Sequence, residues 1–441
     1  MAPSHALPSS TATRKARLSR LILGLVYFSA LCALILWESR ERFDLLSSPC
    51  DLAETAPKSS LYAEPYRYFL DWASHDAPNH VNIISIPVEL EEIQGNLCHA
   101  RAYMADLLRS VATQHPSEVV IDKFYSPSSC VSDPGSTREL QTVIQSLPFP
   151  VIIGESTNVA SSPIQHSCLL CKPQLDFASP NVHHGLTRLN ADPEKVPLEW
   201  TVLPIASDNN QKPRQLDSLA WAAVKLYDPA YAARPRIQAL VDSKRHPYAN
   251  LDNELPHQTS TQLLCSAGTA DMQHRWSATC PGALQTPNLL GKIVLIGAEN
   301  PVDRQKVLGT TLWGLDLQAR YIDTLLSSSF LYELPFAATF FIFALYVFII
   351  EGLPTLLIAF RPRWKKKWFI CHAYPRRRFF WVGFWTIAFV LICSFVSLLL
   401  RYLPPLAVLG DIAFVAVTRL LLFAAEASEH PFVHGKKKGA H

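Results

Sequence analysis

Acidic and amide side chains follow three hydrophobic segments that have the character of buried β-strands. Asp122 ends one such segment, Glu155 follows the next, and Glu299, Asn300 and Asp303 follow the last. In open α/β sheets, ligands bind beyond the carboxyl ends of the strands, where loops converge on a rigid support. We therefore predict that these five residues contribute to a ligand site. The alternative for each is a helix cap or a surface loop position.

A second pattern with chemical potential is the Cys168-Leu-Leu-Cys171 motif, which has His166 before it and His183 and His184 after it. This spacing occurs in redox and zinc sites. A redox pair would be expected at the start of a helix, and a closed zinc site needs two further well-placed ligands. We therefore expect Cys168 and Cys171 to form structural disulfides in a loop, and we expect no metal site.

Other motifs of catalysis are missing from the sequence. With 16 glycines in 441 residues, the chain has no phosphate-binding or dinucleotide-binding glycine pattern and no G-x-S-x-G nucleophile turn. The sequence thus predicts a protein that is not an enzyme and has no cofactor. A hydrolase triad of dispersed residues stays an open alternative, because distance along the chain does not fix distance in space.

The elements that must position these residues alternate between strands and helices, which predicts an α/β fold with a mostly parallel sheet and flanking helices. The expected strands are Val81–Ile86, Glu118–Phe124, Pro150–Gly154, Thr201–Ile205 and Lys292–Gly297. The expected helices are His99–Gln114, Ser136–Leu147, Gln215–Leu226 and Leu315–Ser328. Residues 156–199 and 230–290 are rich in Pro, Asn, Asp, His and Ser, and we expect long loops or small insertions there.

Four apolar runs are long enough to cross a bilayer core of roughly 30 Å. They are Leu21–Trp37, Pro335–Phe360, Phe379–Leu400 and Leu403–Ala425. A cleaved signal peptide is the alternative for the first run, but its apolar stretch exceeds the usual h-region of about 7–15 residues. We therefore expect an uncleaved N-terminal anchor and three C-terminal transmembrane helices.

The charge distribution predicts the orientation of these helices. Residues 39–334 carry 23 Lys and Arg against 32 Asp and Glu, a net charge of −9, whereas residues 1–20 hold 4 Lys and Arg and residues 361–378 hold 8. Short basic segments stay in the cytoplasm. The expected organisation is a cytoplasmic N-terminus (1–20), an anchor (21–38), an extracytoplasmic domain (39–334), three transmembrane helices (335–425) with a cytoplasmic loop (361–378), and a cytoplasmic tail (426–441).

Two charged residues, Asp411 and Arg419, lie within the last apolar run. They are two helical turns apart and about 80° apart around the axis, so they share a face. A charge in hydrocarbon costs at least about 2.5–3.5 kcal/mol, so such residues normally contact a partner or a bundle interior. Both are therefore candidate intramembrane polar contacts. The alternative for Arg419 is that it extends to the cytoplasmic boundary.

Seven of the ten cysteines fall in the domain expected outside the cytoplasm, where disulfides persist. Spacing does not fix connectivity. Besides Cys168 and Cys171, the pairs closest in sequence are Cys50 with Cys98 and Cys265 with Cys280. The odd number leaves at least one thiol unpaired.

Several segments resemble, in order, the CHASE type 2 sensors, a family of extracellular sensory domains of cyclases and histidine kinases. Val81–Ile86 and Glu118–Phe124 resemble its first two strands, and residues 99–110 lie where the family has a helix. Gly291–Ala298 is the strongest match. Trp313–Ala319 is similar to the family's Pro-Gly-Val-Glu-x-His-Ala segment, with Trp313 in place of Pro and Gln318 in place of His.

The resemblance implies a stand-alone bacterial inner-membrane sensor that lacks an output domain. Its extracytoplasmic domain would detect a small-molecule or peptide ligand and signal through its membrane helices to a separate partner protein. We expect the lipid bilayer to be a further partner and expect no nucleic-acid partner. Homo-oligomers are possible. The alternatives are a structural or assembly subunit of an envelope complex and an exported enzyme.

Overall fold

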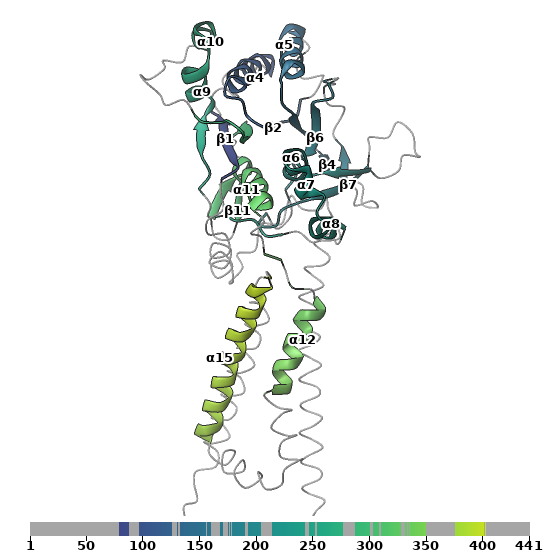
Figure 1. Cartoon of the computed structure of the whole chain (residues 1–441), viewed down its shortest axis with the longest axis vertical. Helices are drawn as coiled ribbons and strands as arrows, with labels where there is room; N and C mark the ends of the chain where they lie inside the picture. The colour runs from purple at the N-terminus through teal and green to yellow at the C-terminus, as the bar shows by residue number, and fades with distance from the viewer. Residues whose placement is uncertain are drawn as a thin grey trace, which may run out of the picture.

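A computed structural model describes the α/β domain and parts of the C-terminal helices (Figure 1). The described residues are 79–87, 97–125, 130, 133–155, 157–159, 168–170, 175, 177, 179–189, 193–203, 214–242, 247–251, 254–276, 287–299, 303–307, 310–327, 331–332, 334, 336–349, 375–400 and 402.

The central element is a six-stranded sheet in the order β6-β3-β2-β10-β1-β9, in which every neighbouring pair is parallel. β10, the last strand of this sheet in sequence order, inserts between the first two. The bounds are β1 (Val81–Ile86), β2 (Glu118–Asp122), β3 (Val151–Glu155), β6 (Val182–Leu186), β9 (His257–Thr259) and β10 (Ile293–Ala298). The predicted α/β class with a mostly parallel sheet is confirmed.

Both faces of this sheet are covered, because its central strands are apolar on both sides. All six residues of β1 are buried. Alternate residues point to opposite faces. Ile83 thus packs into one core with helices α6 (Leu219–Tyr227) and α11 (Gly314–Ser327), the α6–α11 core. Ile84 packs into the opposite core with α4 (Leu97–Ala112), α5 (Pro134–Ser146) and α9 (Ser260–Ala267), the α4–α5 core. Figure 1 shows these two helical layers on either side of the sheet.

Local sequence signals set where several helices begin. Asp133 caps α5, which has Pro134 in its first turn, and Ser218 caps α6 by accepting a hydrogen bond from the amide of Trp221 at 3.0 Å. Thr259 forms a capping box with Gln262 at the start of α9. Shorter helices are α7 (Pro229–Ala232), α8 (Pro235–Asp242) and α10 (Ala270–Arg275).

A second sheet corrects part of the sequence-based prediction. The strand expected at Thr201–Ile205 is β7 (Glu199–Leu203), and it pairs with β5 (Cys168–Leu170) and β8 (Arg214–Asp217) outside the central sheet. β4 (Thr157–Val159) completes this sheet. The two segments expected as long loops or small insertions contain β4 to β6, α7 to α10 and β9. Their strands are short, so apolar periodicity did not indicate them. The helix expected from Gln215 begins at Leu219, because residues 214–217 pair as a strand.

Below the domain in Figure 1 lie α12 (Phe336–Val347) and α15 (Pro375–Leu399). Within the part of the chain that the structure describes, no helix has both the length and the hydropathy needed to cross a membrane. The predicted runs 21–37 and 403–425 lie outside the described residues.

Candidate ligand site at the carboxyl edge of the sheet

The parallel arrangement brings together three of the five predicted ligand residues. Asp122 and Glu155 are the last residues of β2 and β3, and Glu299 directly follows β10. All three therefore lie at the carboxyl edge of the central sheet. Asp303, which precedes the β11–β12 hairpin (Arg304–Val307 and Thr310–Trp313), joins them at this edge beside α11. Asn300 lies outside the described residues.

Asp122 and Asp303 form a close acidic pair. Burial, followed by the charge of Asp303, raises the pKa of Asp122 to about 7. Burial also raises the pKa of Asp303, and a hydrogen bond with the Gln305 side chain opposes this shift. The Asp303 carboxylate lies against Gly314, where a Cβ atom would be 2.0 Å from Oδ2. A glycine is therefore needed at the first position of α11 for the carboxylate to lie there.

A second group of charges surrounds the other side of the α11 N-terminus. His257, the first residue of β9, lies 2.9 Å from Glu299 through its Nε2 atom. Burial raises the pKa of Asp316 in the first turn of α11, while His257 and Arg320 lower it. Sequence reasoning did not select His257 or Asp316. For Asp316, the available signal was the segment Trp313–Ala319, which resembles the family pattern.

Gln318 is a further residue at this edge that was noted only as a departure from the family pattern. It is 1 % exposed, and its Nε2 donates to the carbonyl of Thr187 at 2.9 Å. Its Oε1 atom is buried and has no hydrogen-bond partner among the residues that the structure describes. Thr187 bonds the Glu155 carbonyl through its amide at 3.1 Å. The Gln318 amide group is thereby held beside the carboxyl end of β3.

Glu155 belongs to a different part of the edge. Its carboxylate lies 3.5 Å from Nδ1 of His184 on β6, the strand at one side of the sheet. The structure thus separates the four described residues of this set into the Asp122–Asp303 pair, the Glu299–His257 pair and the outlying Glu155–His184 pair.

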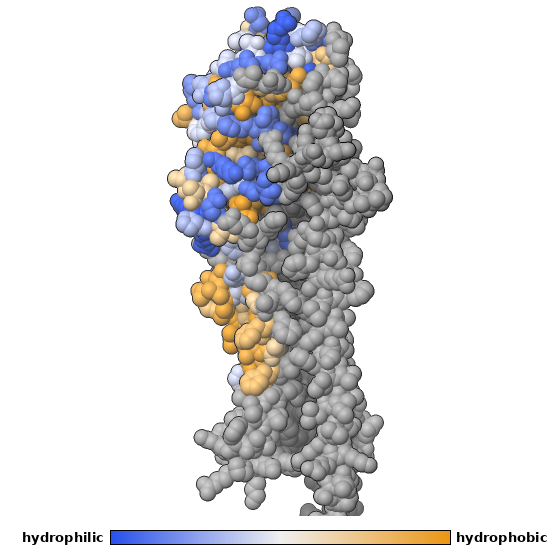
Figure 2. Space-filling view, turned by 90° about the vertical axis from the view of Figure 1, so that its right-hand side faces the viewer, coloured by the Kyte–Doolittle hydropathy of each residue, from blue (hydrophilic) through white to orange (hydrophobic). Residues whose placement is uncertain are grey.

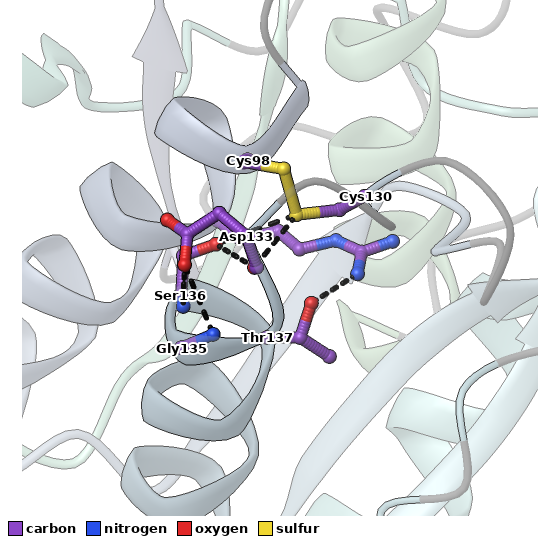
Figure 3. Close-up of a disulfide and its surroundings, with 7 residues drawn as sticks. Cys98, Cys130, Asp133, Gly135, Ser136 and Thr137 are labelled. Carbon is purple, nitrogen blue, oxygen red and sulfur yellow. Dashed lines mark hydrogen bonds between the residues drawn. A yellow bond between two sulfur atoms is a disulfide. The ribbon is translucent and has the colours of Figure 1, made fainter.

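The disulfide pattern differs from the expected one. Cys98 at the start of α4 bonds to Cys130, with Cα atoms 5.1 Å apart, and so does not pair with Cys50 (Figure 3). Close by, Asp133 caps α5, and Arg101 donates to Thr137 Oγ1 at 2.5 Å. The link thereby joins the start of α4 to the segment before α5. The expected pairing was wrong because closeness in sequence does not determine which strand ends and loops meet.

The other predicted cysteines are less fully described. Cys265 is disulfide-bonded, and its expected partner Cys280 lies outside the described residues. Cys168 lies on strand β5 rather than in a loop, and Cys171 lies outside the described residues, as do Cys50, Asp411 and Arg419. Across the described residues, no three His, Cys, Asp or Glu side chains converge as metal ligands.

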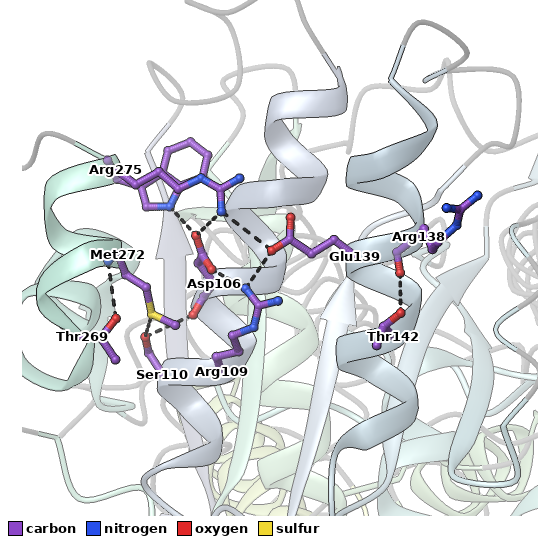
Figure 4. A network of polar contacts seen from close by, with 10 residues as sticks. Asp106, Arg109, Ser110, Arg138, Glu139, Thr142, Thr269, Met272 and Arg275 are labelled. Carbon is purple, nitrogen blue, oxygen red and sulfur yellow. Dashed lines mark hydrogen bonds and ion pairs between the residues drawn. The ribbon is translucent and has the colours of Figure 1, made fainter.

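A separate polar network joins the helices that cover the α4–α5 core (Figure 4). The side chain of Asp106 on α4 is 3 % exposed. Its carboxylate accepts hydrogen bonds from the guanidinium groups of Arg109 at 2.5 Å and Arg275 at 3.2 Å, and from the indole nitrogen of Trp276 at 2.8 Å. Glu139 on α5 lies 2.9 Å from Arg109. Because the charges of this network are mutually paired, it holds α4, α5 and α10 together and has the character of a structural element.

Comparison with known proteins assigns the chain to a class of protein. Residues 54–353 match the CHASE2 domain, so the chain belongs to the CHASE2 family, whose members are extracellular sensory domains. No curated protein and no solved structure matches the chain. The resemblance seen in the sequence is thereby confirmed.

Proposed function

We propose that the chain is a membrane-anchored bacterial sensor and not an enzyme. Its CHASE2 domain would detect a ligand at the carboxyl edge of the sheet, outside the cytoplasm, and pass the signal through membrane helices to a separate partner protein. The family assignment supports a sensory role, and the acidic edge is the position where open α/β sheets bind ligands.

The observation that carries this proposal is the position of α11 between the acidic edge and the C-terminal helices. At its first residue, Gly314 contacts Asp303. Near its other end, the carbonyl of Leu325 accepts a hydrogen bond from Tyr231 at 2.5 Å, and Leu325 is buried in the α6–α11 core. A rigid helix thus links the candidate site to the core on the side of α12 and α15.

The C-terminal helices contact the same core. Tyr332 is buried in it, and Leu398 on α15 and Tyr402, which follows α15, pack against it. Tyr332 and Tyr402 form an isolated parallel β-bridge, and their rings lie 6.1 Å apart. We call these two residues the tyrosine junction. A shift of α11 would reach α15 through these packed side chains.

The surface of α12 and α15 supports a lipid environment. Large apolar side chains on these helices are exposed, including Phe341 at 66 %, Phe384 at 65 % and Phe395 at 67 %. Apolar surface gathers on this helical part, while hydrophilic surface prevails over the domain (Figure 2). Contiguous apolar surface of this kind marks membrane or partner contact. The basic residues 376–378 at the start of α15 favour a cytoplasmic position for that end.

The mechanism would be a population shift between two packings of the tyrosine junction. A ligand can move such an equilibrium only by its difference in affinity for the two states. Asp303 lies against the first residue of α11. A ligand that moves this carboxylate would therefore also change the most stable position of the helix. The ligand would therefore bias the junction through the helix.

A matched pair of glycine substitutions tests this coupling. Cysteines replace Tyr332 and Tyr402 in the full chain in membranes, and mass spectrometry follows the rate at which the linked peptide forms. Gly314→Ala displaces Asp303 and is expected to change that rate severalfold. Gly383→Ala on α15, where a Cβ has no neighbour within 4 Å, should leave it unchanged. Equal rates in both variants would show that the edge and the junction are not coupled.

A further inference from the structure

Two side chains of this edge, Asp122 and Gln318, have under-satisfied hydrogen-bond acceptors. Asp122 makes no hydrogen bond or ion pair with any described residue, and its main electrostatic neighbour is the like-charged Asp303. Gln318 Oε1 is buried and has no hydrogen-bond partner in the described part of the chain. A buried acceptor without a partner is destabilising, so native proteins rarely keep one without a reason.

Contacts with α11 bring these acceptors to the same place. A Cβ on Gly297 would lie 3.2 Å from Cβ of Asp122 and 2.6 Å from Leu315, so Asp122 adjoins the first turn of α11. Asp303 lies against Gly314, the residue before Leu315. Gln318 is one turn further along the same face of the helix as Gly314, because residues four apart share a face.

The far side of Gln318 is fixed by Thr187. A Cβ on Gly154 would lie 2.3 Å from the Thr187 side chain and 3.1 Å from the amide nitrogen of Lys123, the residue after Asp122. The Gln318 amide group, which donates to the Thr187 carbonyl, is therefore held beside the ends of β2 and β3. Asp122 is the last residue of β2, so the Gln318 amide group lies at the same end of the strands as the Asp122–Asp303 pair.

Nearby basic groups are engaged elsewhere. His257 pairs with Glu299 at 2.9 Å, and the guanidinium of Arg188 lies over the ring of Trp200, 5.9 Å from its centroid. The positive end of the α11 dipole accounts for the position of Asp303. It does not supply a donor to the Gln318 oxygen or to Asp122.

We infer that the edge formed by Asp122, Asp303 and Gln318 binds the primary ammonium group of a small molecule. This inference specifies the ligand class at the site of the proposed function. An ammonium group carries one positive charge and three hydrogen-bond donors, and so matches two carboxylates and one amide oxygen. An anion would be repelled by the two carboxylates.

Binding of simple probes to the full chain in lipid nanodiscs tests the inference. The probes are butylammonium, butyltrimethylammonium and butanol, which share a carbon chain but differ in charge and in hydrogen-bond donors. Calorimetry is expected to show butylammonium binding at least tenfold tighter than the other two. Equal binding of butyltrimethylammonium would reveal attraction by charge alone, and no binding of butylammonium would equally overturn the inference.

Three variants locate the binding. Asp122→Asn and Gln318→Leu are each expected to weaken butylammonium binding at least tenfold. Asp271→Asn, which removes an exposed acid on α10, should leave the affinity unchanged. Gln318→Leu also removes the bond to Thr187, so thermal unfolding without a probe is measured for each variant.

Asp122→Asn keeps the test decisive if Gln318→Leu does not fold. It removes a carboxylate that faces a like charge, so the variant should unfold at a temperature no lower than the wild type while losing affinity. Undiminished binding in Asp122→Asn would overturn the ammonium site. The glycine cross-linking experiment does not depend on the ligand, so a coupled junction with no ammonium binding would refute this inference and leave the sensor proposal standing.

Discussion

Cys98 and Cys130 are joined by a disulfide that closes a segment with a sequence separation of 32 residues. A loop of this length predicts a stabilisation of about 3–4 kcal/mol, chiefly by restricting the unfolded chain. Cys98→Ser should therefore lower the free energy of unfolding by about this amount, as measured by urea denaturation. Cys393→Ser is the matched control, because Cys393 is a free thiol. A Cys98→Ser protein as stable as the control would contradict the prediction.

Glu118 at the start of β2 predicts a specific pH dependence of stability. It is 1 % exposed, its Oε1 atom has no hydrogen-bond partner among the described residues, and burial raises its pKa to about 9. The folded state therefore binds a proton more tightly than the unfolded state, and stability falls as pH rises from the unfolded pKa through about 9.

Glu118→Gln removes this titration while keeping the shape of the side chain. We expect the variant to be more stable than the wild type at pH 8 by about 1–3 kcal/mol, since one pKa unit corresponds to about 1.4 kcal/mol. This gain in the free energy of unfolding should become smaller toward pH 5. Glu254→Gln, at an exposed position, is the control. A gain independent of pH would show that packing, and not the charge, is responsible.

Asp122 predicts a similar effect in a lower pH range. Its pKa is raised to about 7, so the folded state is favoured by protonation and loses stability as pH rises from about 4 to about 7. Asp122→Asn should flatten this part of the profile. Thermal unfolding at pH 5 and pH 8 measures this effect. The unfolding temperature of the variant should exceed that of the wild type at pH 8 and differ little from it at pH 5. An equal gain at both values would contradict the shift.

The buried network around Asp106 predicts a loss of stability that comes from broken ion pairs and not from a shifted pKa. Asp106 accepts from Arg109, Arg275 and Trp276 while almost completely buried. Removing one partner of a buried charge group typically costs about 3–5 kcal/mol, and the exposure of both arginines reduces this. We expect Asp106→Ala to lose about 2–4 kcal/mol in urea denaturation, against less than about 0.5 kcal/mol for the exposed Asp271→Asn. Equal stabilities would show that the network is dispensable.

The sequence predicts some parts of this fold well and others poorly for physical reasons. β1, β2, β3 and β10 are apolar on both faces, and such runs are visible without a structure. β6 reads Val-His-His-Gly-Leu and β9 reads His-Gln-Thr, and both lie at the sheet edges, where burial is incomplete. Periodicity therefore does not reveal them. The insertion of β10 between β1 and β2 is set by tertiary packing and has no local signal.

The candidate site likewise has a part that the sequence predicts and a part that it does not. The positions of Asp122 and Glu299 follow from their place at strand ends, which needs only the strand prediction and the parallel arrangement. The pairing of Glu299 with His257 and the role of Gln318 depend on contacts between residues distant in sequence. The resemblance to the CHASE2 family brought Gln318 to notice, whereas His257 lay in a segment read as a loop.

The last prediction concerns membrane topology, which follows from charge. Residues 39–334 have a net charge of −9, and the segment 361–378 holds 8 Lys and Arg. Because short basic segments are retained in the cytoplasm, the domain should lie outside and this loop inside. Alkaline phosphatase fused after residue 200 should be active in a bacterial host, and a fusion after residue 370 should be inactive.

Replacing Lys365, Lys366 and Lys367 with glutamine provides a control within the same chain. The change lowers the positive charge of the loop without adding acidic residues, so some molecules should place the loop outside and the residue-370 fusion should gain activity. The residue-200 fusion reports whether the domain itself stays exported. An active residue-370 fusion in the unchanged chain, together with an inactive residue-200 fusion, would reverse the orientation and place the acidic edge in the cytoplasm.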